Sequence, residues 1–340
     1  MKLEDFWYIV TPSHHLKPNT LLSRTILDEW LVIFRDDNGK PVALRDRCIH
    51  RNSRLSKGKL CQGKLQCQYH GWVYDKTGQV VAIPSEGKDF TTTSTRRTTA
   101  YTTKEQDGYI YIRLAENPSE EFAPFKMPHY KEPGWETVRV INRFANNVTN
   151  CAENFIDIPH TTSVHPGIFR NQRQQQLEMT VQRCNGSVYV EYRNETNNLG
   201  WFSRFLNLDN NQIYHKDTFH LPNITSVEYD MGTNRKLFIT SQSIPETENS
   251  TLVYTDVTFN YGIWNKIAKP FVRQTAQYII NQDIEILGIQ QDVIAKYGTH
   301  FTNTPADTIH VFVESIRNKI LAGEDPRDLP DKSVRVKFWV

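Results

Sequence analysis

The sequence predicts an α+β protein of two domains. An N-terminal antiparallel β domain precedes a C-terminal domain in which an antiparallel sheet combines with long helices. Three observations indicate this fold class: short strands with hairpin turns fill the first third, alternating segments recur after residue 136, and two long helical patterns follow late in the chain. A chain of 340 residues is long enough to bury two such cores.

The first domain is expected to span residues 1–115. We expect its strands at 4–9, 20–26, 29–35, 41–46, 65–70 and 108–114, with a hairpin within 72–83. The pair Asn38-Gly39 lies between two apolar runs, which is a strong hairpin signal. The strands at 41–46 and 65–70 are each expected to deliver a ligand loop to the same end of the domain.

The second domain is expected to span residues 137–340, after a linker at 116–136 that is rich in Pro, Glu and Lys. Its expected strands are 137–144, 177–183, 187–193, 225–232, 236–244 and 252–262. Helices are expected from about Pro270 to Tyr297 and from about Pro305 to Leu321, with proline near a helix start. The apolar end, 334–340, is expected to pack on a neighbour. An antiparallel sheet with a long helix resembles a helix-grip architecture.

Two cysteines and two histidines form the clearest motif of the chain. They are Cys48 and His50 in a C-x-H arm, and Cys67 and His70 in a C-x2-H arm. Thiolate and imidazole together suit zinc or an iron–sulfur centre. Zinc sites usually draw on separate Cys–Cys and His–His arms. Here each arm carries one of each, which favours a Rieske [2Fe–2S] cluster, in which two Cys hold one iron and two His the other.

A second candidate metal site lies at Asp157, His160 and His165, in a D-x2-H-x4-H array. On a helix, Asp157 and His160 would share a face. Pro159 makes a regular helix past His160 doubtful, and a break there would bring His165 to the same metal. Two His plus a carboxylate are typical of mononuclear non-haem Fe(II) sites. Such a pair alone is more often structural, and only the cluster motif in the same chain favours an iron site here.

With Glu153, these residues match the pattern E-x3-D-x2-H-x4-H position for position. The chain thereby resembles, over nearly its whole length, the α subunit of the Rieske non-haem iron oxygenases, a family of dioxygenases, monooxygenases and demethylases. The resemblance is to the short, α3-type members. It implies that His160 and His165 are iron ligands. It also implies that Asp157 bridges a cluster-ligating His of one subunit to an iron-ligating His of the next.

The third iron ligand implied by the resemblance is a carboxylate on the late helix, with Asp283, Glu285 and Asp292 as candidates. Asp283 has apolar neighbours at minus four, minus three and plus four, so it falls on the buried stripe of that helix. A carboxylate there is costly unless it is paired or coordinates a metal. Asp292 shares a more polar face. We therefore expect Asp283 to be the ligand.

The resemblance implies an enzyme that hydroxylates (monooxygenates) a small organic substrate with O2. Demethylation of O- or N-methyl groups and desaturation are the alternatives within the family. Electrons would come from NAD(P)H through a separate ferredoxin or flavin reductase, because the chain has no flavin or nicotinamide motif. A homotrimer is expected. The segment 5–32 is similar to members that tailor natural products, including guanidinium alkaloids of the saxitoxin type.

Composition limits the other possibilities. A net charge of +2 argues against nucleic acid or an anionic membrane as partner, and no apolar run approaches a membrane span. Three cysteines remain beyond the motif, which argues against a disulfide framework and fits a reducing cytoplasm. Two rival functions are a Rieske electron carrier without oxygen chemistry and a ligand-binding module. Iron content would separate these from the oxygenase.

Overall fold

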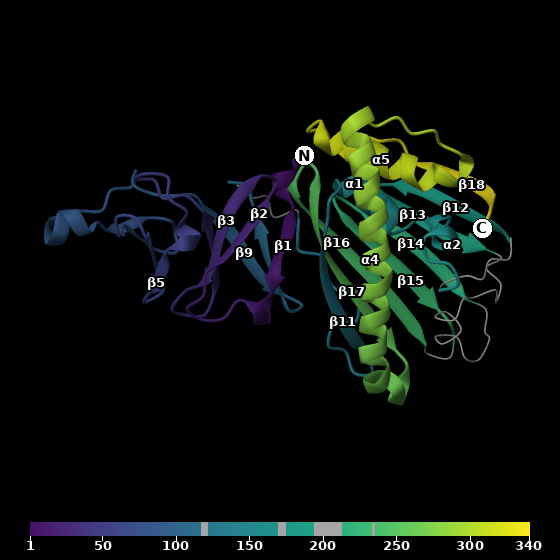
Figure 1. Cartoon of the computed structure of the whole chain (residues 1–340), viewed down its shortest axis with the longest axis horizontal. Coiled ribbons are helices and arrows are strands. Elements are labelled where there is room, and N and C mark those ends of the chain that lie inside the picture. The colour runs from purple at the N-terminus through teal and green to yellow at the C-terminus, as the bar shows by residue number, and fades with distance from the viewer. Residues whose placement is uncertain (117–121, 169–174, 194–212, 233–234) are drawn as a thin grey trace. The chain divides into compact units, whose positions relative to one another are not determined.

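The computed structural model describes residues 1–116, 122–168, 175–193, 213–232 and 235–340. They form two compact units, Glu4–Lys126 and Met127–Val340, the second of which also includes Met1–Leu3. Figure 1 shows the strands and helices of each unit. The division between the units falls within the segment 116–136, for which the sequence suggests a linker; its residues 117–121 lie outside the described part.

The first unit contains two antiparallel sheets, as its hairpin signals predict. The larger sheet has the order β1 (Trp7–Pro12), β10 (Tyr109–Arg113), β9 (Ala100–Gln106), β4 (Pro41–Arg45), β3 (Glu29–Arg35) and β2 (Leu22–Ile26). The smaller sheet has the order β5 (Lys59–Cys61), β6 (Lys64–Gln66), β7 (Val73–Tyr74) and β8 (Val80–Ala82). Short 3-10 turns lie at Leu3–Asp5, Ser13–His15, Leu55–Lys57 and Pro84–Asp89.

The hairpin between β3 and β4 turns at Asp36–Gly39, where the sequence predicts it. Gly39 has a φ of 74°, a conformation that glycine adopts without strain. The Asp36 carboxylate accepts hydrogen bonds from the backbone N–H groups of Asn38 and Lys40. Residues 31–34 of β3 are completely buried, so this hairpin belongs to the core that supports the ligand loops.

One expected strand of this unit is too long. The prediction of a strand over 65–70 is wrong after Gln66, where β6 ends. The chain then turns tightly, because the N–H of Gly71 donates to the carbonyl of Cys67 and Gly71 has a φ of 72°. The N–H of Cys67 donates in turn to the carbonyl of Trp72. Cys67 and His70 therefore lie in a turn and not at the end of a strand.

The second unit is built on one antiparallel sheet in which neighbours in space are mostly neighbours in sequence. Its order is β11 (Glu136–Phe144), β17 (Ser250–Asn260), β16 (Lys236–Thr247), β15 (Ile224–Asp230), β14 (Tyr214–His220), β13 (Ser187–Arg193), β12 (Gln176–Cys184) and β18 (Lys332–Trp339). The C-terminal segment pairs with β12, which explains its apolar side chains. The expected strands of this sheet all occur.

Four described helices accompany this sheet: α1 (Val148–Asn154), α2 (His160–Ser163), α4 (Asn265–Tyr297) and α5 (Thr308–Leu321). Short 3-10 turns lie at Gly262–Trp264, Pro305–Asp307 and Pro326–Asp328. The long helix α4 crosses the sheet over β11 and β17, and α5 packs on β12 and β13 (Figure 1). Val272, Ile280 and Leu287 of α4 are buried in the core, as the apolar stripe of this segment predicts.

The start of α4 differs from the prediction. The helix begins at Asn265, five residues before Pro270, which lies inside it. Its entry is fixed by Asn265, whose side chain accepts from the N–H of Tyr261 and donates to the carbonyl of Gly134. Before α5, a capping box between Thr304 and Asp307 forms a 3-10 turn, so that helix proper starts at Thr308. In the described part of the chain, no helix has the length and apolar character of a membrane span.

Candidate metal centres and their cavity

The two cysteine–histidine arms of the first unit come together in space. Cys48 and Cys67 are both 2% exposed and belong to one core cluster, and neither forms a disulfide. The rings of His50 and His70 lie edge to face with their centroids 4.5 Å apart. Trp72 stacks against His50 at 4.7 Å and nearly parallel. The four predicted cluster residues are thus gathered at the ends of two loops.

Backbone hydrogen bonds hold the first of these loops in shape. The N–H of Cys48 donates to the carbonyl of Ser53, and the N–H of Asn52 donates to the carbonyl of Cys48. The Tyr74 hydroxyl donates to Cys48 Sγ at 3.1 Å and accepts from the N–H of Ile49. A buried sulfur that already accepts a hydrogen bond is arranged to carry negative charge, as a cluster-bound thiolate does.

Electrostatics and unmet hydrogen bonds agree with a bound group between the loops. Burial raises the pKa of the Cys48 thiol, the Tyr74 hydrogen bond opposes this, and nearby Cys67 raises it further. Two neighbouring thiols resist losing both protons, because the two negative charges would repel each other. A metal bound to both sulfurs would remove that cost. The Nδ1 atom of His50 is buried and has no hydrogen-bond partner within the described residues. Two thiols, two imidazoles and one free ring nitrogen fit a Rieske [2Fe–2S] cluster.

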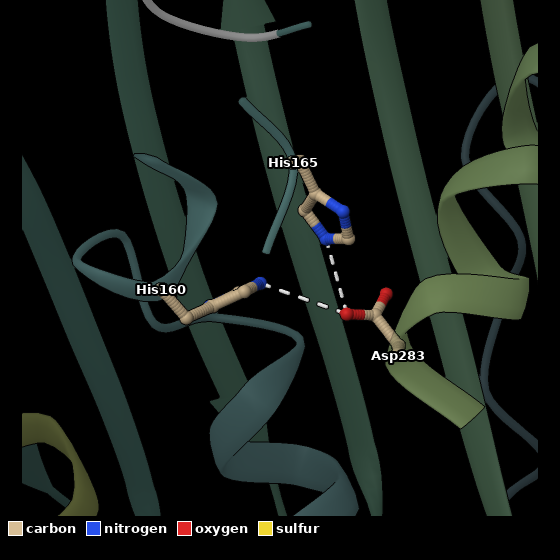
Figure 2. A group of neighbouring side chains, drawn as sticks. All are labelled: His160, His165 and Asp283. Carbon is tan, nitrogen blue, oxygen red and sulfur yellow. Dashed lines mark ion pairs between the residues drawn. The ribbon is translucent and has the colours of Figure 1, made fainter. Parts of the chain in front are cut away.

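The second candidate centre lies in the second unit, where three residues from two segments converge (Figure 2). Ligand atoms of His160, His165 and Asp283 all lie within 4.8 Å of one another. Asp283 Oδ1 is 3.0 Å from His165 Nε2 and 3.7 Å from His160 Nε2. Among the described residues, no other set of three or more such side chains has ligand atoms that all lie this close to one another.

Local structure explains how the two histidines reach one point. Helix α1 ends at Asn154, and α2 is only one turn long, from His160 to Ser163. The interruption of the helix therefore comes before Asp157. The sequence suggests from Pro159 that it comes after His160, and this prediction is wrong. Asp157 accepts a hydrogen bond from the N–H of His160. The chain turns again after Ser163, and Figure 2 shows both rings pointing to the same carboxylate.

Asp283 is the candidate carboxylate that lies at this centre. It is 5% exposed on the buried face of α4, whereas the alternatives Glu285 and Asp292 are exposed. Its Oδ1 atom is buried and accepts no well-formed hydrogen bond from the described residues, although two imidazoles approach it. A buried carboxylate oxygen without a donor is costly, and a cation among these atoms would remove that cost.

Two neighbouring side chains orient the imidazoles. Gln282 Oε1 lies 2.8 Å from His165 Nδ1, and Asp157 Oδ2 lies 3.2 Å from His160 Nδ1. Both contacts engage the ring nitrogen that is turned away from Asp283, which fixes the ring orientation. Burial lowers the pKa of His165, but the hydrogen bond and charge of Asp283 and the contact with Gln282 together outweigh it, so that the net shift is upward. Glu153 lies elsewhere: its carboxylate is 2.6 Å from His310 Nδ1 of α5.

His160, His165 and Asp283 line a cavity of about 130 Å³ between α4 and the sheet. Most of its wall is apolar, with side chains such as Phe155, Val227, Ile239, Val257 and Ile279. Its polar lining beyond the three residues includes Asp157, His215, Asp217, Tyr229, Ser241 and Thr255. An apolar cavity with a few polar groups and a candidate metal site is the expected form of a small-molecule site.

Several of these residues are not identified by sequence motifs. His215 lacks ligand spacing and is expected to be a surface or satisfied core histidine; it is buried and hydrogen-bonded to Asp217, but it also lines the cavity. The spacing His-x-Asp on a strand places both side chains on one face, and this signal could have indicated them. Gln282 and Tyr74 carry no such signal.

Two such candidate centres are what a redox metalloprotein with an iron–sulfur cluster and a mononuclear iron requires. Comparison with known families agrees. Residues 6–101 match the Rieske [2Fe-2S] domain. Residues 144–322, more than half of the chain, match the vanillate O-demethylase oxygenase C-terminal domain. The chain therefore belongs to the Rieske non-haem iron oxygenase α-subunit family.

Individual relatives are distant. Chlorophyllide a oxygenase of Chlamydomonas reinhardtii is 34% identical over 129 residues, which cover 37% of this chain and 19% of the relative. Methylxanthine N1-demethylase of Pseudomonas putida is 28% identical over 208 residues, which cover 56% of this chain and 55% of the relative. The chain thus spans about a fifth of the first relative's length and about half of the second's.

Solved structures share the fold over nearly the whole chain. Dicamba monooxygenase bound to dicamba superposes with a TM-score of 0.79 at 22% identity, over 93% of this chain and 97% of that one. NdmA of Pseudomonas putida with caffeine gives a TM-score of 0.77 at 19% identity, over 94% and 92%. At these identities the likeness shows the fold, a β domain followed by an antiparallel sheet with long helices.

Proposed function

We propose that this chain is the oxygenase component of a system that hydroxylates a small organic substrate. The observation that carries the proposal is the convergence of His160, His165 and Asp283 on a mostly apolar cavity, in a chain that also gathers the four Rieske residues. The balance is one O2, two electrons and two protons per substrate: one oxygen atom enters the substrate and the other leaves as water. When bound, the cluster passes single electrons and the mononuclear iron activates O2.

The side chains of the chain have distinct roles in this proposal. Cys48, Cys67, His50 and His70 hold the cluster, and His160, His165 and Asp283 hold the iron. The apolar wall excludes water and orients the substrate, which the proposal places beside the iron without a bond to it. The position at which the substrate is oxidised then depends on its pose. Hydroxylation of an O- or N-methyl group placed there would give a hydroxymethyl group, whose bond to oxygen or nitrogen breaks to release formaldehyde. Demethylation therefore remains the alternative outcome, and desaturation a further one.

The proposal includes a homotrimer in which Asp157 connects two subunits. Asp157 already contacts His160 Nδ1, and its side chain remains 29% exposed. A bridge to a histidine of another subunit requires that one carboxylate oxygen of Asp157 contacts His160 and that part of the carboxylate remains accessible. A heterologous interface that closes on itself gives such a ring. Electrons are proposed to come from NAD(P)H through a separate ferredoxin or flavin reductase.

The finer resemblance, to hydroxylases of guanidinium alkaloids, is likewise a proposal. The substrates that relatives' names state are diverse and include chlorophyllide a, methylxanthines and toluene-4-sulfonate. A cytoplasmic location is proposed from the thiol chemistry alone, since none of the five cysteines forms a disulfide.

Iron content and oxygen consumption test the proposal. Anaerobically purified protein should contain three irons per chain and consume O2 only with electrons and a substrate, supplied by a reductase and a panel of methoxyarenes, methylxanthines and alkaloids. Asp283→Ala should lose the mononuclear iron and keep the cluster absorption. Glu285→Ala, a matched change two residues away on the exposed face, should lose neither. Two irons per chain would make the protein an electron carrier, and none would make it a binding module.

A further inference from the structure

Three aromatic rings form a stack across three neighbouring strands beside the cavity. The ring of His215 on β14 lies between Tyr192 of β13 and Tyr229 of β15, with centroid distances of 4.5 Å and 4.2 Å and interplanar angles of 23°. His215 and Tyr229 are direct cross-strand partners. The stack holds the imidazole in a fixed plane.

This fixed imidazole and one tyrosine both hold a buried carboxylate. Asp217, two residues after His215 on the same face of β14, is 1% exposed. His215 Nε2 lies 2.9 Å from its Oδ1, and the Tyr192 hydroxyl donates to its Oδ2 at 2.9 Å. Its cross-strand neighbours are Val190 and Val227, so the carboxylate lies in an otherwise apolar row of the sheet.

Among the described residues, the negative charge of Asp217 has no lysine or arginine partner. Throughout the described part of the chain, its only ion-pair partner is His215, and no lysine or arginine pairs with it. Hydrogen bonds from an imidazole N–H and a phenol do not require either donor to be charged. A carboxylate accepts about four hydrogen bonds, and two are in place. A carboxylate buried with unmet acceptor capacity is costly unless a ligand completes it.

This carboxylate and the candidate metal centre line the same cavity, so one bound ligand could contact both. Asp217 and His215 line it together with His160, His165 and Asp283. In its own row of the sheet, the wall beside Asp217 is formed by the apolar side chains Val227 and Ile239. A molecule that fills the cavity therefore meets a single fixed negative group on the sheet and a metal site between the sheet and α4.

We propose that Asp217 anchors a positively charged nitrogen group of the substrate, an ammonium or a guanidinium. This inference rests on the proposed function, because it orients that substrate towards the metal centre. The cation would restore the charge balance that the buried carboxylate lacks. The same carboxylate rejects anionic substrates by repulsion, so it selects against carboxylated and phosphorylated analogues.

Two probes of similar shape and different charge test the inference on the iron-loaded protein without turnover. Phenylguanidine is a cation at neutral pH, and phenylurea is neutral. Calorimetric titration under anaerobic conditions should show that phenylguanidine binds at least about tenfold more tightly. Asp217→Asn keeps the shape of the side chain and should remove the preference. Asp256→Asn is the matched control, because Asp256 is equally buried but pairs with Arg139 and does not line the cavity.

The outcomes are separable from those of the proposed function. Equal affinity of the wild-type protein for both probes overturns the inference, even if the variants do not fold. Retention of the preference in Asp217→Asn also overturns it. Protein with three irons and substrate-dependent O2 uptake but without the preference would leave the oxygenase proposal intact. A preference that Asp217→Asn abolishes, in protein with only two irons, would support the cation anchor and defeat the oxygenase.

Discussion

The Nδ1 atom of His165 lies 2.8 Å from the Oε1 atom of Gln282, the residue directly before Asp283. Consecutive residues of α4 therefore engage both nitrogens of one imidazole: Gln282 holds Nδ1, and Asp283 lies 3.0 Å from Nε2. Because an amide oxygen only accepts, the contact requires a proton on Nδ1 and leaves the Nε2 lone pair free. The helix thus selects the tautomer that can bind a metal.

Replacing Gln282 should weaken metal binding without removing a ligand. In Gln282→Leu the ring of His165 loses its orienting acceptor, and we expect iron affinity to fall by roughly 10–100-fold. Competition with a chelator measures the change. Gln277→Leu is the control, because Gln277 is on the same helix and bonds to Asn142 and Asn281 instead. Equal affinity of the Gln282 variant and the control would show that the contact has no part in metal binding.

Replacing Asp157 should separate metal content from turnover. Asp157→Asn keeps a side chain of the same size beside His160, so both metal centres should load normally. We expect loss of nearly all substrate oxidation, because in the proposed trimer the amide could no longer link the imidazoles of two subunits as the carboxylate does. Single-turnover experiments with pre-reduced protein would locate the defect in electron transfer to the iron. Normal coupled turnover of this variant would contradict the bridging role.

Replacing Tyr74 should lower the reduction potential of the cluster. The hydroxyl of Tyr74 donates to Cys48 Sγ, and such a bond stabilises the more negative, reduced state. A net loss of about 1 kcal/mol corresponds to roughly 40 mV for one electron. Redox titration followed by visible absorption measures the shift in Tyr74→Phe. Tyr111→Phe, which changes a buried tyrosine of the same unit that bonds to a backbone carbonyl, should leave the potential unchanged.

The stability of the second unit should fall in mild acid because of His220. Burial, and to a lesser degree Lys216, lowers the pKa of His220 from 6.5 to about 4. Between these pH values His220 is protonated in the unfolded chain but not in the folded one. The free energy of unfolding therefore decreases as the pH falls from about 6.5 towards 4, by up to about 3 kcal/mol. Thermal unfolding across this window should show a shallower loss in His220→Gln. Identical pH profiles would rule out this contribution.

The sequence predicts those parts of the protein that depend on short-range patterns. The hairpin at Asn38-Gly39 follows from turn chemistry, and the cluster loops from the spacing of Cys and His. The choice of Asp283 over Glu285 and Asp292 follows from the apolar stripe of one helix, and the structure places Asp283 with the two histidines. In each case the residues that form the pattern lie within one short segment of the sequence.

What the sequence does not predict depends on contacts between distant segments. Gln282 meets His165 across 117 residues, Tyr74 meets Cys48 across 26, and Tyr192 meets Asp217 across 25. None of these pairs has a local pattern, because the fold alone brings the partners together. The position of Pro270 misleads for a related reason: tertiary contacts of Asn265 extend α4 beyond the residue that usually begins a helix.

The Rieske loops of the first unit have a protected and an open side. Cys48 and Cys67 are 2% exposed, whereas His70 is exposed beside Tyr69. If the cluster receives electrons from the proposed reductase, they would therefore enter at the exposed histidine edge rather than at the buried sulfurs. Water-borne oxidants and chelators approach by the same route. The exposed histidine edge through which the cluster would be reduced is thus also the side from which oxidants would attack it. A partner protein that covers this edge would slow the loss of the cluster.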